Sequence, residues 1–492
     1  KQPSVSTLAA YDLIFRRHPD VTHLRLLSYR FMQRLRASAN RNESLEQLWR
    51  RPIAPRPIYS EAKYLIYQPQ FGMGNQLRAL EAGLAVARVL KRILVVPDYI
   101  SDNGEGIGVR YDAIWEYGFL EELVGRDNVI LQADFNQLLT SDQGGVDPPT
   151  KVFVADMPIK QLTGIDEYFK RLGWGTLPQI NLPVANTTEA GWSEIVGLED
   201  QVLAVSAMFG MFQGWSEDSH AGGEHWHRMV RLHVSEESTW LHDFVEDILT
   251  RFKSKAADAS VNKGRGEAAG SKHGTSKHNE ARGGGETEPE TEFMCAHIRR
   301  QDFEASCARY DEEFQSGKGR EWVVEALQGG GVCWVEESDF RHTVDVFVKR
   351  APSQLGVTPR FVFATSDDSE FLAATKLGNA VPVFSLDDVT LPAELADKSG
   401  VQEADVLESL ATGRTLTAEE VRAALPAIDV AVCSRAPLLV LNYFSTYSAL
   451  IKSKAKAQPD YGKALYWKVT PDLSNWWTTY FGWLSKLFHR SS

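Results

Sequence analysis

Short apolar runs recur along the chain, and several are separated by segments with the periodicity of a helix. The first unit has strands predicted at 64–67 and 93–97. Between them a helix is predicted over 75–91, because its apolar residues recur every three or four positions. A βαβ unit of this kind crosses over with a right hand, so its two strands are predicted to be parallel. Further strands are predicted at 129–131, 152–155, 202–206, 293–298, 361–365, 381–384 and 438–442.

Helical segments alternate with the strands in the second half of the chain. Residues 254–291 have almost no large apolar side chains and are predicted to be a disordered insertion, whereas 387–425 is a charged, helix-prone excursion. Helices are predicted at 226–252, 322–327, 336–349 and 369–377, and a further one opens near 445. The alternation predicts an α/β fold with parallel sheets.

The length of 492 residues makes two domains the expected organisation. We expect an N-terminal stem or flap over 1–60, an N-terminal Rossmann-like domain over 60–227 and a C-terminal nucleotide-sugar-binding domain over 228–470. Residues 471–492 form an aromatic tail that is expected to pack back on the protein, with contact to a membrane surface as the alternative.

Charge and composition limit the classes of function. A net charge of −12 argues against a general nucleic-acid binder, so a phosphate site would have to be a local basic pocket. No window of the sequence approaches a membrane-spanning run of apolar residues. The chain begins at Lys1, and we expect a signal or membrane anchor upstream; sequons at Asn42 and Asn186 also favour the secretory pathway.

The four cysteines match no zinc-binding spacing. Cys295 and Cys433 lie in apolar runs that are typical of a core, whereas Cys307 and Cys333 flank a polar stretch. The second pair is therefore the predicted disulfide in an oxidising compartment, with four reduced cysteines as the alternative.

The strand predicted at 293–298 ends in an unusual group of charged residues. Alternation puts Cys295, His297 and Arg299 on one face of the strand, and Arg300 and Asp302 follow. Ligands of open α/β sheets bind outside the carboxyl ends of strands, where two guanidinium groups favour a phosphorylated or carboxylated ligand. The alternative is a surface ion pair between Asp302 and one of the arginines.

Two other strand ends carry complementary polar groups. Asp367 and Asp368 follow the strand at 361–365, and Ser445 and Thr446 open a predicted helix after the strand at 438–442. Hydroxyls and helix-start amides suit a diphosphate, and an acid at a neighbouring strand end suits a nucleobase or a ribose. Together with the arginines, these residues predict a nucleotide site in the C-terminal half.

A glycine-containing turn precedes the first helix in the N-terminal half. Gly72 and Gly74 allow a tight turn and a close approach to a ligand, and Asn75 is predicted to cap the helix. No P-loop, kinase motif set or nucleophile elbow is present. The sequence also lacks a convincing Asp-x-Asp diphosphate site, so we expect no metal and no prosthetic group, with arginine in place of the metal.

The segments 71–76, 297–303, 365–367 and 445–448 together resemble the motifs of the GDP-fucose protein O-fucosyltransferase superfamily. Members carry a G-x-G-N-Q-type turn, an H-x-R-R-x-D-F-type strand, an A-T-D-type strand end and an S-S-F-S-type turn, in this order. The resemblance implies an inverting, metal-independent transferase with a GT-B-like fold, in which two Rossmann-like domains face a central cleft. It runs from about Tyr64 to Lys454, with gaps at 98–227, 254–291 and 387–425.

The resemblance also implies roles for individual residues. Asn75, beside Gly72 and Gly74, would lie near the diphosphate and sugar of the donor. Arg299 would stabilise charge on the departing nucleotide, which makes Arg299 and Asn75 the expected catalytic residues. The remaining donor-binding residues would be His297, Arg300, Asp302, Asp367, Ser445, Thr446 and Tyr447.

One departure concerns the general base. Some family members have a glutamate three residues before the turn asparagine, where this chain has Gly72. Glu81, Asp302 and Glu304 are therefore only candidate bases. The resemblance implies fucose transfer from GDP-fucose to a protein or glycan hydroxyl in the ER or Golgi lumen. The alternatives are a transferase of UDP-rhamnose or another deoxysugar, and a catalytically silent nucleotide- or glycan-binding relative.

Overall fold

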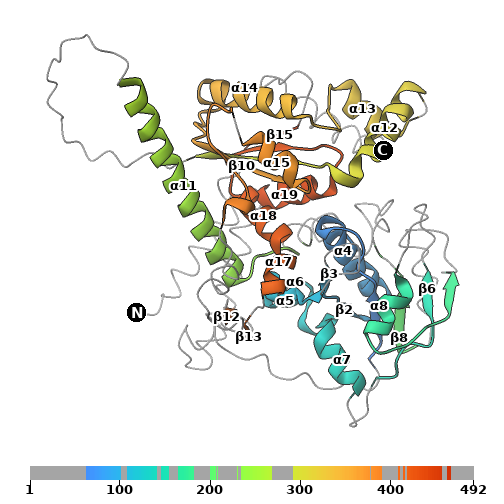
Figure 1. The fold of residues 1–492 in the computed structure, drawn as a ribbon. Coiled ribbons are helices and arrows are strands. Elements are labelled where there is room, and N and C mark those ends of the chain that lie inside the picture. The colour runs from blue at the N-terminus through green and yellow to red at the C-terminus, as the bar shows by residue number, and fades with distance from the viewer. Residues whose placement is uncertain are drawn as a thin grey trace, which may run out of the picture.

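Two parallel sheets, one in each half of the chain, organise the protein (Figure 1). The computed structural model describes residues 62–100, 108–140, 146–154, 164–181, 200–206, 208, 230, 234–268, 292–317, 319–376, 378–389, 408–409, 414–415, 418–456 and 463–466. The predicted stem at 1–60, the sequons and the aromatic tail lie outside these residues, so those expectations stay predictions.

The first sheet has six parallel strands in the order β5-β2-β1-β8-β6-β7. Its strands are β1 (Tyr64–Tyr67), β2 (Ile93–Val96), β5 (Val129–Leu131), β6 (Val152–Val154), β7 (Gln179–Asn181) and β8 (Val202–Val205). A separate antiparallel pair consists of β3 (Tyr99–Ile100) and β4 (Gly108–Val109). The βαβ unit predicted at the start of this domain is therefore confirmed.

The helices around the first sheet are α4 (Met73–Leu90), α5 (Tyr111–Ile114), α6 (Tyr117–Val124), the 3₁₀ turn η2 (Arg126–Asn128), α7 (Gln132–Thr140) and α8 (Ile165–Arg171). Leu65 and Tyr67 of β1 face a core that contains α4, whereas Tyr64 and Ile66 face a second core with α7 and α8. This two-sided burial explains why β1 is apolar at every position rather than alternating.

The second sheet has five parallel strands in the order β11-β10-β9-β14-β15. Its strands are β9 (Phe293–Ile298), β10 (Phe361–Ser366), β11 (Val383–Phe384), β14 (Leu438–Leu441) and β15 (Lys463–Tyr466). The helices and 3₁₀ turns of this half are α11 (Thr239–Ala268), η3 (Gln301–Phe303), α12 (Glu304–Gln315), α13 (Glu321–Gln328), α14 (Glu337–Leu355), α15 (Ser369–Thr375), η4 (Leu386–Asp388), α17 (Ala418–Ala423), α18 (Leu425–Ser434) and α19 (Thr446–Lys456).

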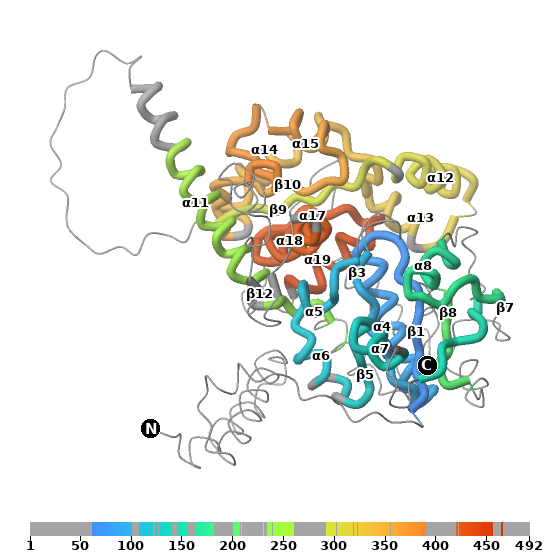
Figure 2. Tube along the Cα trace, turned by 60° about the horizontal axis from the view of Figure 1, so that its bottom comes forward, coloured from blue at the N-terminus to red at the C-terminus, as the bar shows by residue number. Residues whose placement is uncertain are grey.

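The central strand β9 shows how its two faces divide the core. Cys295 faces the inner cluster with α11 and α18, which is continuous with the core around α4. Met294, Ala296 and Ile298 face an outer cluster covered by α14 and α15. One continuous core therefore joins the two halves, and α4 and α19 lie side by side between them in Figures 1 and 2.

A buried ion-pair cluster ties the far end of α19 to the N-terminal half. Lys454 donates to the carbonyl of Ser235 at 2.6 Å and pairs with Glu237 at 3.2 Å, and its ammonium lies 5.5 Å from the ring centre of Trp115. Arg435 pairs with Glu237 at 2.6 Å. Burial alone would raise the pKa of Glu237, but these cations and His242 hold it well below its usual range.

Three expectations about regular structure need correction. The helix predicted over 226–252 is interrupted at 234–238, where the chain turns and Glu237 forms a bridge with Trp115; Val230 is helical, and α11 begins at Thr239. The same helix continues to Ala268, so the predicted disordered insertion is wrong over 254–268; Ala256 is buried there and extends the packed face. Within the excursion at 387–425, α17 is helical as predicted, whereas β12 (Glu408–Ser409) and β13 (Arg414–Thr415) form an antiparallel pair.

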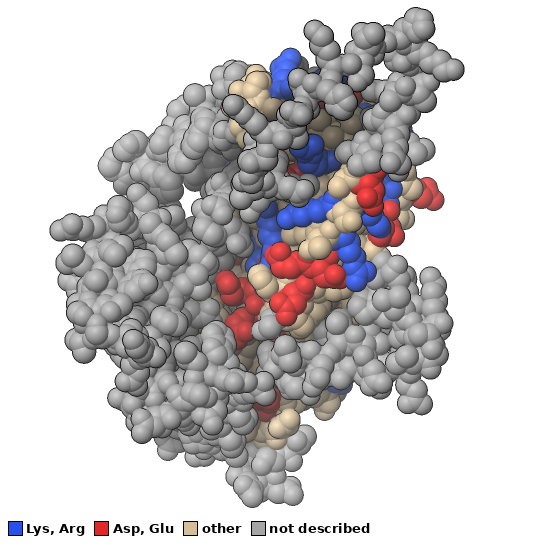
Figure 3. Space-filling model, turned by 90° about the vertical axis from the view of Figure 1, so that its left-hand side faces the viewer, with Lys and Arg blue, Asp and Glu red and all other residues tan. Residues whose placement is uncertain are grey.

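The face that carries α11 mixes both signs of charge (Figure 3). On α11 the exposed acids Asp243, Glu246 and Asp247 precede the exposed bases Arg251 and Lys255. Among the described residues, no helix is long and apolar enough to cross a membrane.

Candidate functional site

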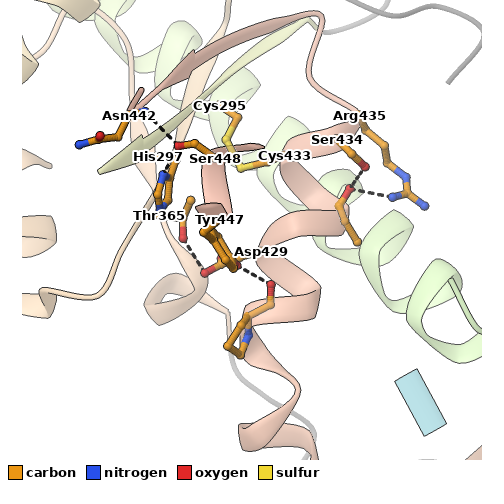
Figure 4. The surroundings of a disulfide bond; sticks show 12 residues. Cys295, His297, Thr365, Asp429, Cys433, Ser434, Arg435, Asn442, Tyr447 and Ser448 are labelled. Carbon is orange, nitrogen blue, oxygen red and sulfur yellow. Dashed lines mark hydrogen bonds between the residues drawn. A yellow bond between two sulfur atoms is a disulfide. The ribbon is translucent and has the colours of Figure 1, made fainter. Parts of the chain in front are cut away.

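His297 lies near the carboxyl end of β9 and is buried at 4% exposure. Its Nδ1 is 2.6 Å from Ser448 Oγ on α19, and its ring packs 5.0 Å from the ring of Tyr447 (Figure 4). Because Ser448 Oγ accepts the backbone N–H of Asn442 at 3.0 Å, we assign its proton to the bond with Nδ1. The imidazole then carries its own proton on Nε2.

Burial, with a smaller contribution from Arg299, lowers the pKa of His297 to about 3. The ring is therefore neutral at physiological pH. A neutral imidazole with Nε2–H donates a hydrogen bond without adding a second full charge beside Arg299. That is suitable for a group that orients a phosphate next to an arginine.

The two arginines after β9 differ in their surroundings. Arg299 keeps 35% of its side chain exposed and pairs with Asp367 at 2.8 Å. Arg300 is only 15% exposed and lies between the rings of Trp334 and Phe371, at 4.2 Å and 4.5 Å. Arg299 continues the inner face of β9 with His297, whereas Arg300 packs against residues of the outer side.

The polar bonds of Arg300 fix it in place. Its Nε pairs with Asp368 at 3.1 Å, and its Nη1 donates to the carbonyl of Val335 at 2.5 Å. The two arginines therefore do not form a symmetrical clamp. Arg300 is held by protein groups, whereas Arg299 is more exposed and pairs with Asp367; the expectation that both guanidinium groups bind a diphosphate stays a prediction.

Asp367 and Asp368 organise the turn after β10. Asp367 accepts the backbone N–H of Arg300 at 2.7 Å in addition to its pairing with Arg299. Asp368 caps α15 by accepting the N–H of Phe371 at 2.9 Å. Asp367 is thus beside the predicted phosphate-binding group, and the assignment of this residue to a base or ribose stays a prediction.

The glycine turn of the N-terminal half meets α19 directly. A Cβ placed on Gly74 would lie 3.1 Å from the backbone of Thr446 and Tyr447. Only a residue without a side chain allows this approach without displacement. The turn and the helix start therefore meet, as the sequence predicted, although they are more than 370 positions apart in the chain.

The backbone of the glycine turn is held in an uncommon shape. Phe71 has a φ of +64°, a conformation that is rare for a bulky side chain. Gln76 fixes the turn by donating to the carbonyls of Phe71 and Ile100, both at 2.6 Å. Gln301, after the arginines, also has a positive φ, of +36°. Such conformations gather at ligand-binding sites.

Asn75 does not cap the helix, contrary to the prediction. The helix begins at Met73 with Gly72 as its N-cap, so Asn75 lies inside the first turn. Its side-chain Oδ1 is buried without a hydrogen-bond partner among the described residues. A buried carbonyl oxygen at a helix start that touches the other half is a group that a ligand can satisfy.

The hydroxyl groups at the start of α19 are partly used by the protein. Ser445 Oγ accepts the N–H of Ser448 at 3.4 Å and so caps the helix, and the hydroxyl of Tyr447 donates to the carbonyl of Pro426 at 2.5 Å. Burial raises the pKa of Tyr447 well above its usual range, so it stays a neutral donor. The backbone amides of Thr446 and Tyr447 are the groups that this helix start offers to an anion.

A functional candidate that the sequence reasoning missed is Asp429 on α18. It accepts a hydrogen bond from Thr365 Oγ1 at 2.6 Å, and Thr365 pairs in register with His297 (Figure 4). Burial raises the pKa of Asp429 to about 7; the bond from Thr365 opposes this and Asp387 adds to it. The signal in the sequence was a single acid within the apolar run at 427–432.

The candidate general bases are not drawn together. Glu81 lies on α4 two turns beyond Asn75, Glu304 is exposed at the start of α12, and the side chain of Asp302 lies outside the description. Among the described residues, no three His, Cys, Asp or Glu side chains come together as metal ligands would.

The disulfide prediction is confirmed and was incomplete. Cys307 and Cys333 are bonded, and so are Cys295 and Cys433, which were expected only to be core residues. The second pair joins β9 to α18 immediately behind His297.

Comparison with known proteins places this arrangement in a structural class. The chain matches no protein-family model, and no curated protein is significantly similar to it in sequence. Among solved structures, POFUT1 in complex with GDP-fucose superimposes with a TM-score of 0.50 and 13% identity, covering 83% of this chain and 99% of that chain. The fold is GT-B.

The superposition on POFUT1 extends over both Rossmann-like halves, so the fold class predicted from the sequence is confirmed. The resemblance to O-fucosyltransferases that the motifs indicated is likewise confirmed at the level of the fold. The apo form of POFUT1 gives a TM-score of 0.49 at 14% identity, over 84% of this chain and 99% of that chain. The fucosyltransferase NodZ from Bradyrhizobium gives a TM-score of 0.35 at 14% identity, over 80% of this chain and 92% of that chain.

Proposed function

We propose that this chain is an inverting, metal-independent glycosyltransferase that moves fucose from GDP-fucose to a hydroxyl group of a protein Ser or Thr, or of a glycan. The observation that carries the proposal is the contact of Gly74 with Thr446 and Tyr447. It brings the start of α4, where the amide oxygen of Asn75 has no hydrogen-bond partner among the described residues, against the start of α19. The fold shared with POFUT1, whose structure holds GDP-fucose, supports this choice of donor.

The proposed reaction is a displacement at the anomeric carbon of fucose. The acceptor oxygen forms the new bond from the face opposite the diphosphate, and the bond between the anomeric carbon and the phosphate oxygen breaks. The electron pair of that bond leaves with GDP, and the acceptor proton passes to a base or to water. Arg299 and the amides at the start of α19 would stabilise the negative charge that develops on the diphosphate.

His297 would serve this reaction as a fixed hydrogen-bond donor. Its pKa of about 3 makes it a poor general base, since a base that works near neutrality needs a pKa closer to the working pH. The bond from Ser448 to Nδ1 would hold the ring with Nε2–H in a constant orientation. The residue that takes the acceptor proton is therefore to be sought among carboxylates, of which Glu81, Asp302 and Glu304 are the candidates.

Carboxylates near the end of β10 suit the base of the donor. Guanine presents a ring N–H and an amino group side by side, and one carboxylate accepts both. Asp367 and the buried Asp429 both lie at this end of the sheet. Uracil offers a single ring N–H, so a carboxylate reader favours GDP-fucose over a UDP-sugar.

A first experiment tests the donor. We expect GDP to raise the melting temperature of the protein more than UDP, and we expect slow hydrolysis of GDP-fucose in a panel of nucleotide sugars. Stronger stabilisation by UDP, with hydrolysis of UDP-rhamnose, would reassign the donor within the same fold. Tight GDP binding without turnover of any donor would favour a silent nucleotide-binding protein, a candidate supported by Gly72 at the place of the glutamate in some relatives.

A second experiment tests the role of Arg299. Arg299→Ala removes the more exposed of the two guanidinium groups after β9 and is expected to reduce transfer or donor hydrolysis by about 10²–10³-fold, the usual loss for one transition-state charge stabiliser. Arg251→Ala is the matched control, because Arg251 forms an ion pair with Asp247 on α11 in which both side chains are 48% exposed. Appreciable turnover in Arg299→Ala, with the control normal, would remove Arg299 from the mechanism.

The setting of the enzyme is part of the proposal. Two disulfides in one chain favour an oxidising compartment, and we propose the lumen of the ER or Golgi. Its partners would be the nucleotide-sugar donor and a protein or glycan acceptor. Immunogold labelling of the tagged full-length protein would test the location.

A further inference from the structure

The inner face of β9 and the helix α18 are connected at two successive levels. At the first level Cys295 is bonded to Cys433, with their Cα atoms 5.2 Å apart. At the second level Thr365, the register partner of His297, donates to Asp429 at 2.6 Å. The disulfide lies beneath the hydrogen bond, on the side of the core (Figure 4).

The spacing of the two levels is the same on the sheet and on the helix. His297 is two residues beyond Cys295, which is about 6.6 Å along a strand and on the same face. Asp429 is four residues before Cys433, which is about 6 Å along a helix and also on the same face. The disulfide and the Thr365–Asp429 bond are therefore neighbouring cross-links between one sheet and one helix.

The hydrogen bond between Thr365 and Asp429, the second level, depends on a close fit between β10 and α18. Asp429 is partly buried, and the groups facing it are Thr365 from β10, Asp387 from η4 and Tyr447 from α19. None of these supplies a positive charge, so a small outward movement of α18 would admit water to the carboxyl group and lengthen its bond to Thr365. A covalent link one turn away opposes that movement.

We propose that Cys295 and Cys433 form a positioning pair for the donor site: their disulfide holds α18 against the sheet so that Asp429 and His297 keep the geometry that recognises the nucleotide. The cysteines touch no ligand and act through these two residues. The inference relies on the proposed function for the identity of the ligand, whereas the positioning of Asp429 is independent of it. Donor recognition would then require the oxidised form of this pair.

The first test needs no ligand. The melting temperature of Asp429→Asn is compared with that of the unchanged protein from pH 5 to 9; the difference grows as the pH rises and levels off at the titration midpoint of Asp429 in the folded protein. The midpoint is expected near pH 7 with the disulfide intact. In Cys295→Val/Cys433→Ala, which fills much of the space of the disulfide, water reaches Asp429 and the midpoint is expected to fall by about one unit or more.

The other disulfide provides the matched control. Cys307→Ala/Cys333→Ala removes a cross-link of the same chemistry that joins α12 to the segment before α14. The midpoint of Asp429 should stay near pH 7 in this variant. A general loss of stability would affect both disulfide variants. Only a positioning role of Cys295 and Cys433 would lower the titration midpoint of Asp429 in their variant and leave it unchanged in the Cys307/Cys333 variant.

The second test measures GDP affinity by calorimetry. The Kd for GDP is expected to rise about tenfold or more in Cys295→Val/Cys433→Ala and to stay within about threefold in the control variant, a tenfold change being the equivalent of one pKa unit. If the double variant does not fold, reduction of the folded, unchanged protein by dithiothreitol, with mass spectrometry to follow each disulfide, replaces it.

The outcomes separate the two proposals. An unchanged Asp429 midpoint in the folded protein lacking Cys295–Cys433 would overturn the positioning role, whatever GDP does. Absence of GDP binding to the unchanged protein would instead overturn the proposed function, while the pH titration would still decide the role of the disulfide. An equal loss of GDP affinity in both disulfide variants would also count against a specific role for Cys295 and Cys433.

Discussion

Gly74→Ala is the substitution that tests the site most directly. The added Cβ would be 3.1 Å from the carbonyl carbon and oxygen of Thr446 and from the amide nitrogen of Tyr447. Comfortable carbon contacts lie at about 3.5–4.0 Å, so the two backbones would have to separate by roughly half an ångström. Backbone atoms cannot rotate away as the end of a side chain can, and the strain would be carried by the contact between the two halves.

The cost of that separation can be estimated from general values. Overpacking of a close contact costs about 1–3 kcal/mol, whereas Gly→Ala within a helix gains about 0.5–1 kcal/mol. The net loss of unfolding free energy at Gly74 is therefore expected to be about 1–2 kcal/mol. Misplacement of catalytic groups by about 1 Å can cost about 100-fold in rate, so half that distance is expected to lower kcat/KM for the donor by about tenfold.

Two other glycines of the same segment serve as controls. Gly72→Ala meets no protein atom within 4 Å, so it is the control for stability, with at most a small loss at the N-cap. Gly83→Ala meets the side chains of Tyr67 and Leu94 at 3.0 Å and 3.2 Å, so it should lower stability and leave kcat/KM intact. Urea unfolding and GDP-fucose hydrolysis are measured on all three. Normal turnover and stability in Gly74→Ala would refute the inferred contact.

Three further predictions concern groups around the site. Arg300→Ala should lower the unfolding free energy by about 3 kcal/mol in urea titrations, because it leaves a paired acid and a buried carbonyl unsatisfied; a change below about 1 kcal/mol would contradict its structural role. Ser448→Ala should lower the free energy of unfolding by about 1–3 kcal/mol, because it leaves the N–H of Asn442 without its partner. It should also lower kcat more than it raises KM. An unchanged kcat would show that Ser448 does not orient His297 for the reaction. Asp429→Asn should stabilise the protein by about 2 kcal/mol at pH 8 and little at pH 4. The folded-state pKa of Asp429, about 7, is raised above the unfolded value of about 3.9, so the unchanged protein loses stability as the pH rises through that interval. Equal effects of the substitution at both pH values would show that the carboxyl is not held neutral.

Local sequence patterns predicted the strands and the meeting of their polar ends. β9 and β5 have the predicted bounds, and Gly74 and Thr446 meet although neither reveals the other in the sequence. The polar ends of β9, β10 and β14 come together because strands of one parallel sheet send their carboxyl ends to the same edge. Gly74 follows β1 of the other sheet, so its contact with Thr446 depends on how the two sheets face each other, which only the family resemblance implied. Successive residues of a strand point to opposite faces, so the alternation along β9 also predicts that Arg299 lies on the inner face and Arg300 on the outer face.

These local patterns do not predict which distant residues come into contact. Asp429 lies in an apolar run that reads as core, and only the packing of α18 against β10 reveals that its carboxyl meets Thr365. The bond between Cys295 and Cys433 likewise depends on which strand the helix covers. The helix boundary at Thr239 was set by pairing of residues 234–238 with the other half, a contact that local propensity does not contain.

The attachment of α19 at both ends has a consequence for how the molecule unfolds. Its first residues abut Gly74, and Lys454 in its last turn is held by Ser235 and Glu237 beside Trp115. A C-terminal half produced alone would lose the Trp115 ring beside Lys454, and either half alone would expose the apolar surface of the shared core. The two lobes should therefore melt in one calorimetric transition, with a van't Hoff enthalpy close to the calorimetric value.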